Sequence, residues 1–212
     1  MARPVSALMA LAVAAGLAAG APALAASPAA SLPDEMSMGS AKAKVTVIEY
    51  ASASCPHCAR FNNTVWPAFK AKYVDTGKVR FELREFLTQP VEVAAAGWLT
   101  ARCAGKAKYF SSVDNFFRGQ EEMYRTGDAR KLINETGARA GLTVAQIDAC
   151  LADQDAIKAL NDRVQRYVEK DQVHGTPTFK INGKPLPDTG HEVTLADLDA
   201  AIAPLLKPTG RR

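Results

Sequence analysis

The sequence predicts an α/β fold in which a block of helices interrupts a small sheet. Strand-like segments occur near 45–50 and 78–86 and return only near 178–186. Residues 91–172 carry helical patterns broken by glycines and contain no convincing strand. The pair Asn182-Gly183 specifies a tight hairpin before the final helix. This order of elements is typical of α/β proteins.

The segment 1–25 is predicted to be a cleaved secretory signal. Arg3 precedes a stretch rich in Ala, Leu, Val and Gly, and the small residues Ala23-Leu24-Ala25 end the segment. The stretch is shorter and less apolar than a membrane span, which needs roughly 20 strongly apolar residues. An uncleaved membrane anchor is the alternative. We therefore expect a soluble protein outside the cytosol.

Charge and length restrict what the rest of the chain can be. The formal net charge of +4 falls to +3 without Arg3, and acids and bases are interspersed, so charge indicates no nucleic-acid or membrane partner. Residues 26–40 are rich in Ser, Pro, Ala and Met and are predicted to form a flexible lead-in. The roughly 170 residues from about Ala41 onward can bury a sizeable core without relying on disulfides.

Residues 41–90 are predicted to form two strands and a helix. The first strand, Val45 to Tyr50, is β-branched and mostly apolar, as expected for a strand covered on both faces, and Glu49 is its anomaly. A helix from about Pro56 to Tyr73 has one apolar face and an internal proline that should kink it. The strand from about Lys78 to Phe86 alternates apolar and charged residues, so we expect one fully covered face.

Helices are predicted throughout 91–172, and residues 173–212 should complete the sheet. The expected elements are a short helix capped by Thr143 and running through Cys150, a helix from about Gln154 to Lys170, a strand from Thr178 to Ile181, a return strand from Lys184 to Leu186, and a final helix from about Thr194 to Leu206.

The most informative residues are Cys55-Pro56-His57-Cys58. Two thiols separated by two residues can close a small disulfide ring and exchange it with another protein. Cys55 should lie at a helix N-terminus, where free backbone N–H groups and the helix dipole favour an anion, so we expect it to be the nucleophile. Cys58 should be more shielded and act as the resolving thiol, and Pro56 suits the first helical position.

Three separated stretches resemble the thioredoxin-fold disulfide oxidoreductases, and within them the DsbA-like group with a helical insertion. The tetrad Cys55-Pro56-His57-Cys58 matches the active site of that group, and Glu49 lies six residues before it, where the family has a buried acid. Gly175-Thr176-Pro177 and Asn182-Gly183-Lys184 match the cis-proline loop and hairpin. The resemblance implies a thioredoxin fold with an inserted α-helical domain.

The resemblance also implies roles for individual residues. Cys55 should form the mixed disulfide with substrate, and His57 could donate a hydrogen bond or positive charge to its thiolate, which would make the disulfide more oxidising. Pro177 should be cis and lie against the tetrad, leaving the backbone of Thr176 free to pair with an extended substrate segment. The alternative is that Pro177 merely starts a strand.

Glu49 is a costly residue in a buried strand unless its charge is paired or neutralised. The resemblance gives it a role in tuning or relaying protons near Cys58, and a partly exposed acid paired with a lysine is the alternative. Another familial acid is missing, because Asn62 stands seven residues after the first cysteine. Proton handling through that position is therefore in question.

The chain has four cysteines, which allow three pairings. A ring between Cys55 and Cys58 leaves Cys103 and Cys150 as the other pair, and both fall on predicted helices. Closing that loop would stabilise the fold by about 4 kcal/mol in the chain-entropy model. We predict a structural disulfide; a disulfide that modulates the active pair and two buried free thiols are alternatives.

The resemblance implies a periplasmic enzyme, expected to be monomeric, that oxidises cysteine pairs in unfolded exported proteins. A membrane partner of the DsbB type would reoxidise it. A reductase or isomerase on the same fold is the closest alternative, because Thr176 stands where DsbA often has valine and related isomerases have threonine. No separate dimerisation domain precedes Ala41, which disfavours a dimeric isomerase.

Cofactor and metal chemistry are poorly supported by the residues. A haem attachment would need histidine in place of Ala59, and no phosphate-cradling glycine loop occurs, so no cofactor is predicted. A copper or zinc protein is a further alternative, in which Cys55, Cys58 and His57 hold the ion. These are too few well-placed ligands for a tetrahedral site, so no metal is predicted.

Overall fold

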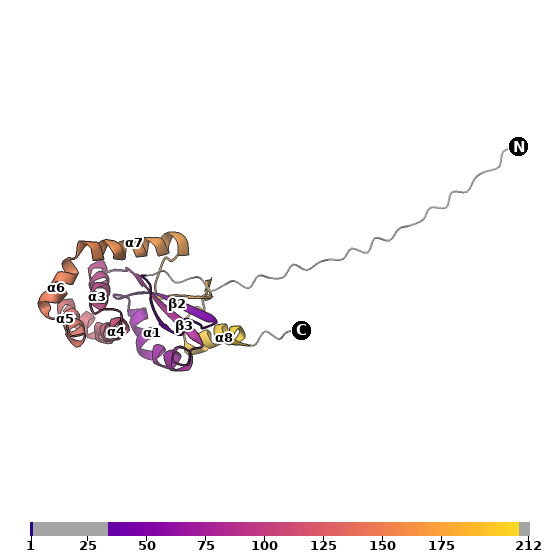
Figure 1. Cartoon of the computed structure of the whole chain (residues 1–212), viewed down its shortest axis with the longest axis horizontal. Helices are drawn as coiled ribbons and strands as arrows, with labels where there is room; N and C mark the ends of the chain where they lie inside the picture. Colours follow the sequence, from indigo (N-terminus) through magenta and orange to yellow (C-terminus); the bar gives the residue numbers. More distant parts are fainter. Residues whose placement is uncertain (2–33, 208–212) are drawn as a thin grey trace.

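A five-stranded sheet is the base of the fold (Figure 1). The computed structural model describes Met1 and residues 34–207, so all but Met1 of the predicted signal segment 1–25 lies outside the described residues. The strands are β1 (Met36–Gly39), β2 (Val45–Ser52), β3 (Val79–Phe86), β4 (Thr178–Ile181) and β5 (Lys184–Pro185). Their order is β1-β3-β2-β4-β5, with β2 and β3 parallel and the other pairs antiparallel.

The central strand β2 is buried along its whole length, as its apolar, β-branched sequence predicts. Val45 and Val47 belong to the main core, together with Leu198 and Ile202 of helix α8 (Leu195–Leu206). Tyr50 lies in a second, smaller cluster with residues of another helix. Figure 1 shows the reason: α1 and α8 lie on one side of the sheet, whereas α7 runs along the other.

Strand β1 corrects the end of the flexible lead-in predicted over 26–40; residues 26–33 of that segment lie outside the described residues. Met36–Gly39 pairs with β3, with Met36 opposite Leu83, so the folded part begins before Ala41. The preceding residue, Glu35, is buried and its carboxylate accepts a hydrogen bond from the Tyr167 hydroxyl at 2.8 Å. A four-residue edge strand is too short to show a clear alternation of apolar and polar residues in the sequence. It forms because β3 pairs with it and Tyr167 binds the residue before it.

Strand β3 corrects a second expectation, that only one of its faces is fully covered. Seven of its eight residues are buried, and only Arg80 is partly exposed. The Arg84 guanidinium donates hydrogen bonds to the Tyr50 hydroxyl at 2.9 Å and the Asp171 carboxylate at 2.8 Å. Charged side chains can be buried here because α7 covers them and supplies partners.

The helix expected from Pro56 to Tyr73 is divided into three pieces. These are α1 (Pro56–Thr64), α2 (Trp66–Phe69) and the π-helical turn η1 (Lys70–Val74). The break falls just before Pro67, which has no backbone N–H to continue the helical hydrogen bonds. The predicted kink is therefore a change of helix.

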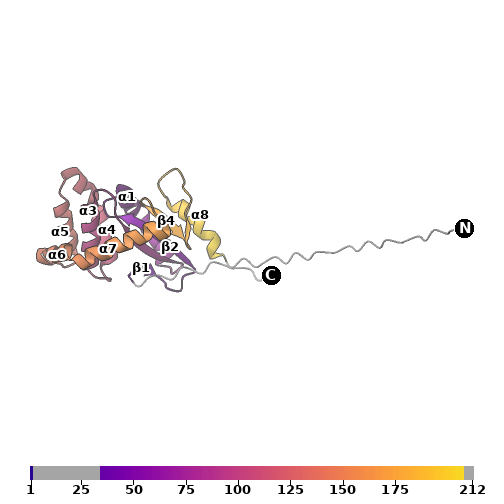
Figure 2. The same ribbon diagram turned by 90° about the horizontal axis from the view of Figure 1, so that it is seen from above.

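Residues 91–172 hold five helices, namely α3 (Val91–Cys103), α4 (Tyr109–Thr126), α5 (Ala129–Arg139), α6 (Val144–Ala152) and α7 (Gln154–Asp171). Thr143 caps α6 as predicted, and its hydroxyl and Gln146 form a reciprocal capping box. The helices α3 to α6 gather at one end of the sheet (Figure 1), and Figure 2 shows α7 returning across the sheet. Within residues 34–207, no helix is long and apolar enough to cross a membrane.

Candidate redox-active site

The tetrad lies where β2 meets α1. Strand β2 ends at Ser52, and α1 begins at Pro56 with Cys55 as its N-cap in an extended backbone conformation. A proline suits this first helical position, because the N–H that it lacks would have no partner within the helix. Cys55 and Cys58 are both free thiols, 6% and 0% exposed respectively.

Cys55 is in a setting that favours the thiolate. A hydrogen bond from the Cys58 thiol, followed by the side chain of Thr176 and the backbone N–H groups of Cys58 and His57, lowers the pKa of Cys55 to about 5, against the opposing effect of burial. The Cys55 sulfur lies 3.3 Å from the Thr176 carbonyl oxygen. At neutral pH Cys55 is therefore a thiolate and a competent nucleophile.

Cys58 has the opposite character. Burial, reinforced by the neighbouring Cys55 and by Glu49, raises the pKa of the Cys58 thiol well above its ordinary value. It stays protonated at neutral pH and serves as the hydrogen-bond donor to Cys55. The two sulfurs therefore share one ionisation, which resides on Cys55.

Glu49 is buried beside the two cysteines. Its side chain is on β2, only 4% of the residue is exposed, and its Oε1 atom has no hydrogen-bond partner. Burial first, and then the charge of Cys55, raises the pKa of Glu49 to about 8. The carboxyl group is therefore neutral near pH 7, where it can release or take up a proton with little change in driving force.

The loop before β4 approaches the tetrad. The Thr176–Pro177 peptide bond is cis, as is the Gln89–Pro90 bond. The Thr176 carbonyl contacts the Cys55 sulfur, and the Thr178 hydroxyl donates to the Gly175 carbonyl at 2.7 Å. The structure thus brings Thr176 and Cys55 together across 121 positions of sequence.

The side chain of His57 does not point at the Cys55 thiolate, which corrects the expectation that it donates a hydrogen bond or positive charge there. Its Nδ1 atom lies 2.6 Å from the Glu192 carboxylate, and the Arg60 Nε–H donates to the same oxygen at 2.8 Å. His57 reaches Cys55 instead through its backbone N–H. An acid distant in sequence competes successfully for the imidazole.

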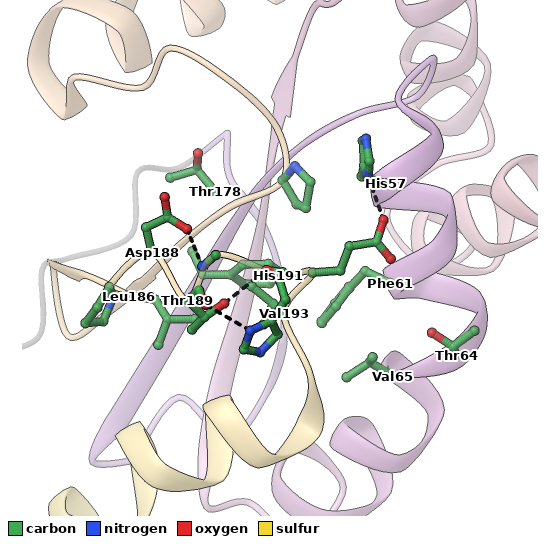
Figure 3. Close-up of a pocket in the computed structure, with 15 residues that line it drawn as sticks. His57, Phe61, Thr64, Val65, Thr178, Leu186, Asp188, Thr189, His191 and Val193 are labelled. Atoms are coloured by element: carbon green, nitrogen blue, oxygen red, sulfur yellow. Dashed lines mark hydrogen bonds and ion pairs between the residues drawn. The ribbon is translucent and has the colours of Figure 1, made fainter.

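A groove of about 610 Å³ opens beside the tetrad (Figure 3). Phe61 of α1 and Val65, the residue between α1 and α2, project into it and face the loop that carries Leu186 and Val193. Pro177 also lines the groove, so it reaches the cis-proline loop. The lining residues combine apolar side chains such as Phe61 with polar ones such as Thr178, as recognition sites for extended peptides do.

Two residues of the helical insertion contact the active-site loop and were not singled out by sequence. The Gln120 side-chain amide donates to the Ala53 carbonyl at 2.7 Å and the Cys55 carbonyl at 3.3 Å. The Tyr124 hydroxyl donates to the Ser54 carbonyl at 2.5 Å. Their spacing of four on α4 places them on one helix face, but no sequence signal identifies the loop as their partner.

Hydroxyl groups also support the loop from the end of β3. The Thr88 N–H donates to the Ser52 hydroxyl at 3.1 Å, and the Ser54 hydroxyl donates to the Thr88 carbonyl at 3.0 Å. Ser52 and Ser54 come just before the tetrad, and Thr88 comes just before the cis Gln89–Pro90 bond. Serine and threonine hydroxyls are common enough that their positions alone did not indicate this role.

The remaining predicted residues lie in the helical insertion or face it. Cys103 on α3 and Cys150 on α6 form a disulfide. Asn62 on α1 is buried and its amide donates to the Asp114 carboxylate of α4 at 3.0 Å, so an acid from another helix lies beside the position of the missing one. In the part of the chain that the structure describes, no three His, Cys, Asp or Glu side chains are grouped as metal ligands.

Comparison with known proteins agrees with this geometry. A family model described as thioredoxin matches residues 31–203. A putative protein-disulfide oxidoreductase of Rickettsia conorii is 34% identical over 152 residues, which are 71% of this chain and 54% of the relative. The chain thus spans about half the length of the rickettsial relative. A probable disulfide bond formation protein D of Bacillus anthracis is 27% identical, with 70% of each chain covered.

Solved structures show the same fold. The crystal structure of Wolbachia pipientis alpha-DsbA1 has a TM-score of 0.72 at 24% identity, covering 83% of this chain and 92% of that one. Oxidised BdbD from Bacillus subtilis has a TM-score of 0.65 at 19% identity, covering 81% and 92%. The predicted fold class is confirmed, and the chain belongs to the thioredoxin family, with the inserted helices of DsbA-like structures.

Proposed function

We propose that this chain is a periplasmic thiol:disulfide oxidoreductase that donates a Cys55–Cys58 disulfide to exported proteins during their oxidative folding. The observation that carries the proposal is the contrast between the two thiols. The pKa of Cys55 is lowered to about 5, whereas Cys58 is fully buried and its pKa is raised. A stabilised thiolate favours the reduced protein, which makes the corresponding disulfide a stronger oxidant.

The exchange proceeds in two steps. A substrate thiolate attacks the Cys55 sulfur, a mixed disulfide forms, and the bond to Cys58 breaks, with its electron pair leaving on the Cys58 sulfur. The second substrate thiolate then attacks the substrate sulfur of the mixed disulfide, and Cys55 leaves as a thiolate. The substrate loses two electrons and gains a disulfide, and the enzyme retains both electrons as a dithiol.

Glu49 supplies the proton that the first step requires. Cys58 leaves as an anion in a fully buried position, where a charge is costly. The carboxyl group of Glu49 is neutral near pH 7 because its pKa is about 8. Glu49 is close enough to Cys58 that its ionised form raises the pKa of the Cys58 thiol. Transfer of its proton to the Cys58 sulfur moves the negative charge to the Glu49 carboxylate, the weaker base of the two, and solvent later neutralises Glu49 by restoring the proton.

Substrate binding uses the groove and the cis-proline loop. An extended segment that carries the attacking cysteine lies along the backbone of Thr176, with Pro177 against the tetrad and apolar side chains facing Phe61 and Val65. Backbone pairing is insensitive to side-chain identity. The site therefore accepts unfolded proteins of many sequences.

We further propose that a membrane partner of the DsbB type removes the two electrons and restores the disulfide, and that the enzyme acts as a monomer in the periplasm. The relatives support an oxidative role through their names, which include a disulfide bond formation protein. The predicted signal segment 1–25 supports the location.

A glutathione redox titration of the mature protein tests the direction of exchange. Alkylation followed by mass analysis separates the Cys55–Cys58 pair from the Cys103–Cys150 pair. A potential well above the thioredoxin range for the first pair supports a disulfide donor. A strongly reducing potential would contradict the proposal and indicate a reductase.

A further inference from the structure

Three successive carbonyl oxygens of the active-site loop are held by one helix of the insertion. Gln120 of α4 donates to the Ala53 and Cys55 carbonyls at 2.7 and 3.3 Å, and Tyr124 donates to the Ser54 carbonyl at 2.5 Å. The Gln120 side chain is buried, so its hydrogen bonds do not exchange with water. A buried carbonyl without a hydrogen-bond partner is costly in free energy, so these contacts should persist in the folded protein.

The insertion also touches this loop through close packing. An added Cβ at Gly97 of α3 would lie 2.6 Å from the Ala53 Cβ and 3.1 Å from the Phe116 ring, so only glycine allows α3 to approach this closely. At the start of α4, the Tyr109 hydroxyl donates to the buried Glu85 carboxylate of β3 at 2.9 Å. Helix α4 is therefore fixed to the sheet at one end and to the active-site loop toward the other.

Holding these carbonyls has an electrostatic consequence for the sulfur that follows them. A carbonyl oxygen carries partial negative charge, and turning it toward a thiolate would destabilise that thiolate. An oxygen bonded to α4 cannot turn, and the Cys55 carbonyl also accepts the Ala59 N–H at 3.1 Å. Within the active-site loop and α1, the N–H groups of His57 and Cys58 then remain the backbone dipoles that face the sulfur, and the carbonyl that does reach it, at 3.3 Å, belongs to Thr176 of the separate cis-proline loop.

The titratable groups around Cys55 come from three elements. Cys58 and His57 are on α1, Glu49 is on β2 and Tyr124 is on α4. Burial and then the charge of Cys55 raise the pKa of Tyr124, so its hydroxyl keeps its proton and stays a donor over the working pH range. Tyr124 thus experiences the thiolate directly while it holds the adjoining carbonyl.

Given the proposed thiol exchange, we propose that Gln120 and Tyr124 are positioning residues that fix the loop carbonyls away from Cys55 and thereby favour its thiolate. The inserted helices then contribute to the redox chemistry itself, in addition to covering the site. Removing a donor destabilises the thiolate and hence the reduced protein. The disulfide becomes a weaker oxidant as a result.

Tyr124→Phe is the test variant, because it deletes one hydroxyl from a residue that is 43% exposed and leaves the ring in place. Tyr73→Phe is the matched control, since the Tyr73 hydroxyl donates a single hydrogen bond, to Asp199 of α8. The full-length mature proteins are compared by the pH dependence of Cys55 alkylation and by equilibrium with glutathione. We expect Tyr124→Phe to raise the pKa of Cys55 and to favour the disulfide about fivefold.

A second variant, Gln120→Met, removes both amide donors and is expected to shift both measurements in the same direction. Unchanged values for Tyr124→Phe would overturn the inference even if Gln120→Met fails to fold. An equal shift in Tyr73→Phe would also overturn it, because the effect would then be general. Absence of thiol exchange by the wild-type protein would instead refute the proposed function. Failure of this inference is therefore distinguishable from failure of the proposed function.

Discussion

The groove side of Cys55 and its buried side are built from different kinds of contact. On the groove side, Glu192 forms an ion pair with Arg60 and a hydrogen bond with His57, and the side chains of Glu192, Arg60 and His57 are 50%, 53% and 57% exposed. On the buried side, Cys58, Glu49 and Gln120 are almost inaccessible to solvent. Exposed ion pairs contribute little free energy, whereas buried polar groups are costly to disturb. The comparison indicates that the buried side sets the chemistry and the groove side can change with each substrate.

The strongest test of the buried side is Cys58→Ala. The first cause of the lowered pKa of Cys55 is the hydrogen bond from Cys58, so the substitution should raise that pKa. It also removes the thiol that closes the disulfide with Cys55, so turnover should be lost. When the Cys55 thiolate of the variant attacks a substrate disulfide, no Cys58 thiol is present to release the substrate, so a mixed disulfide through Cys55 should accumulate. Non-reducing electrophoresis with mass identification measures the trapped species.

Cys55→Ser is the control for that experiment, because it should abolish both turnover and trapping. Trapped substrate on Cys55→Ser, formed through Cys58, would reverse the order of attack. The absence of trapped substrate on Cys58→Ala would count against Cys55 as the nucleophile.

The second disulfide allows stability to be separated from chemistry within the same insertion. Cys103 and Cys150 are 47 positions apart, so replacing both with alanine should lower the free energy of unfolding by about 4 kcal/mol in the chain-entropy model. The pKa of Cys55 should be unchanged, because neither residue contributes to it. Urea unfolding and alkylation kinetics measure the two effects. A changed pKa would give this disulfide a modulating role.

Glu49→Gln tests the buried side through pH. The pKa of Glu49 rises from 4.5 to about 8 on folding, so the native reduced protein retains a proton that the unfolded chain releases. The contribution of Glu49 to native stability therefore falls as pH rises from 4.5 toward 8, by about 3 kcal/mol at pH 7, while the lowered pKa of Cys55 contributes in the opposite direction. The variant has no such ionisation and should lose this contribution, so its stability relative to wild type should increase with pH across the interval, which urea unfolding measures.

The same variant should slow exchange, because glutamine has no proton to give Cys58. Glu92→Gln, an exposed acid in the first turn of α3, is the control and should retain the wild-type pH dependence. If Glu49→Gln and wild type show the same slope and the same exchange rate, the proton-relay role of Glu49 is wrong.

Much of this site was predictable from sequence because its main parts are local. The junction of strand and helix places Cys55 at the α1 N-terminus, and the apolar neighbours of Glu49 indicate its burial. Thr143 caps α6 through a pattern contained in four residues. Such features can be predicted from residues close together in the sequence, through helical or strand periodicity and helix-capping patterns.

The missed features depend on partners far along the chain. Gln120 bonds to Ala53 across 67 positions, and His57 meets Glu192 across 135. The alternation of charged and apolar residues in β3 predicts a solvent-facing side, because no local sequence pattern indicates that Asp171 pairs with Arg84. Polar contacts of this range follow from the tertiary arrangement, which periodicity does not specify.

The smallest expected effect belongs to the groove side, in Glu192→Gln. The Glu192 carboxylate and its partners His57 and Arg60 are exposed, so the free energy of unfolding should change by less than ~1 kcal/mol. Asp162→Asn is the matched control, because Asp162 forms an exposed pair with Lys158 at the same 2.6 Å distance. The variant should also make the Cys55–Cys58 disulfide slightly more oxidising, since His57 is released from a competing carboxylate and can approach the thiolate. A glutathione equilibrium shift larger than that of Tyr124→Phe would break the comparison, because the groove side would then govern the chemistry.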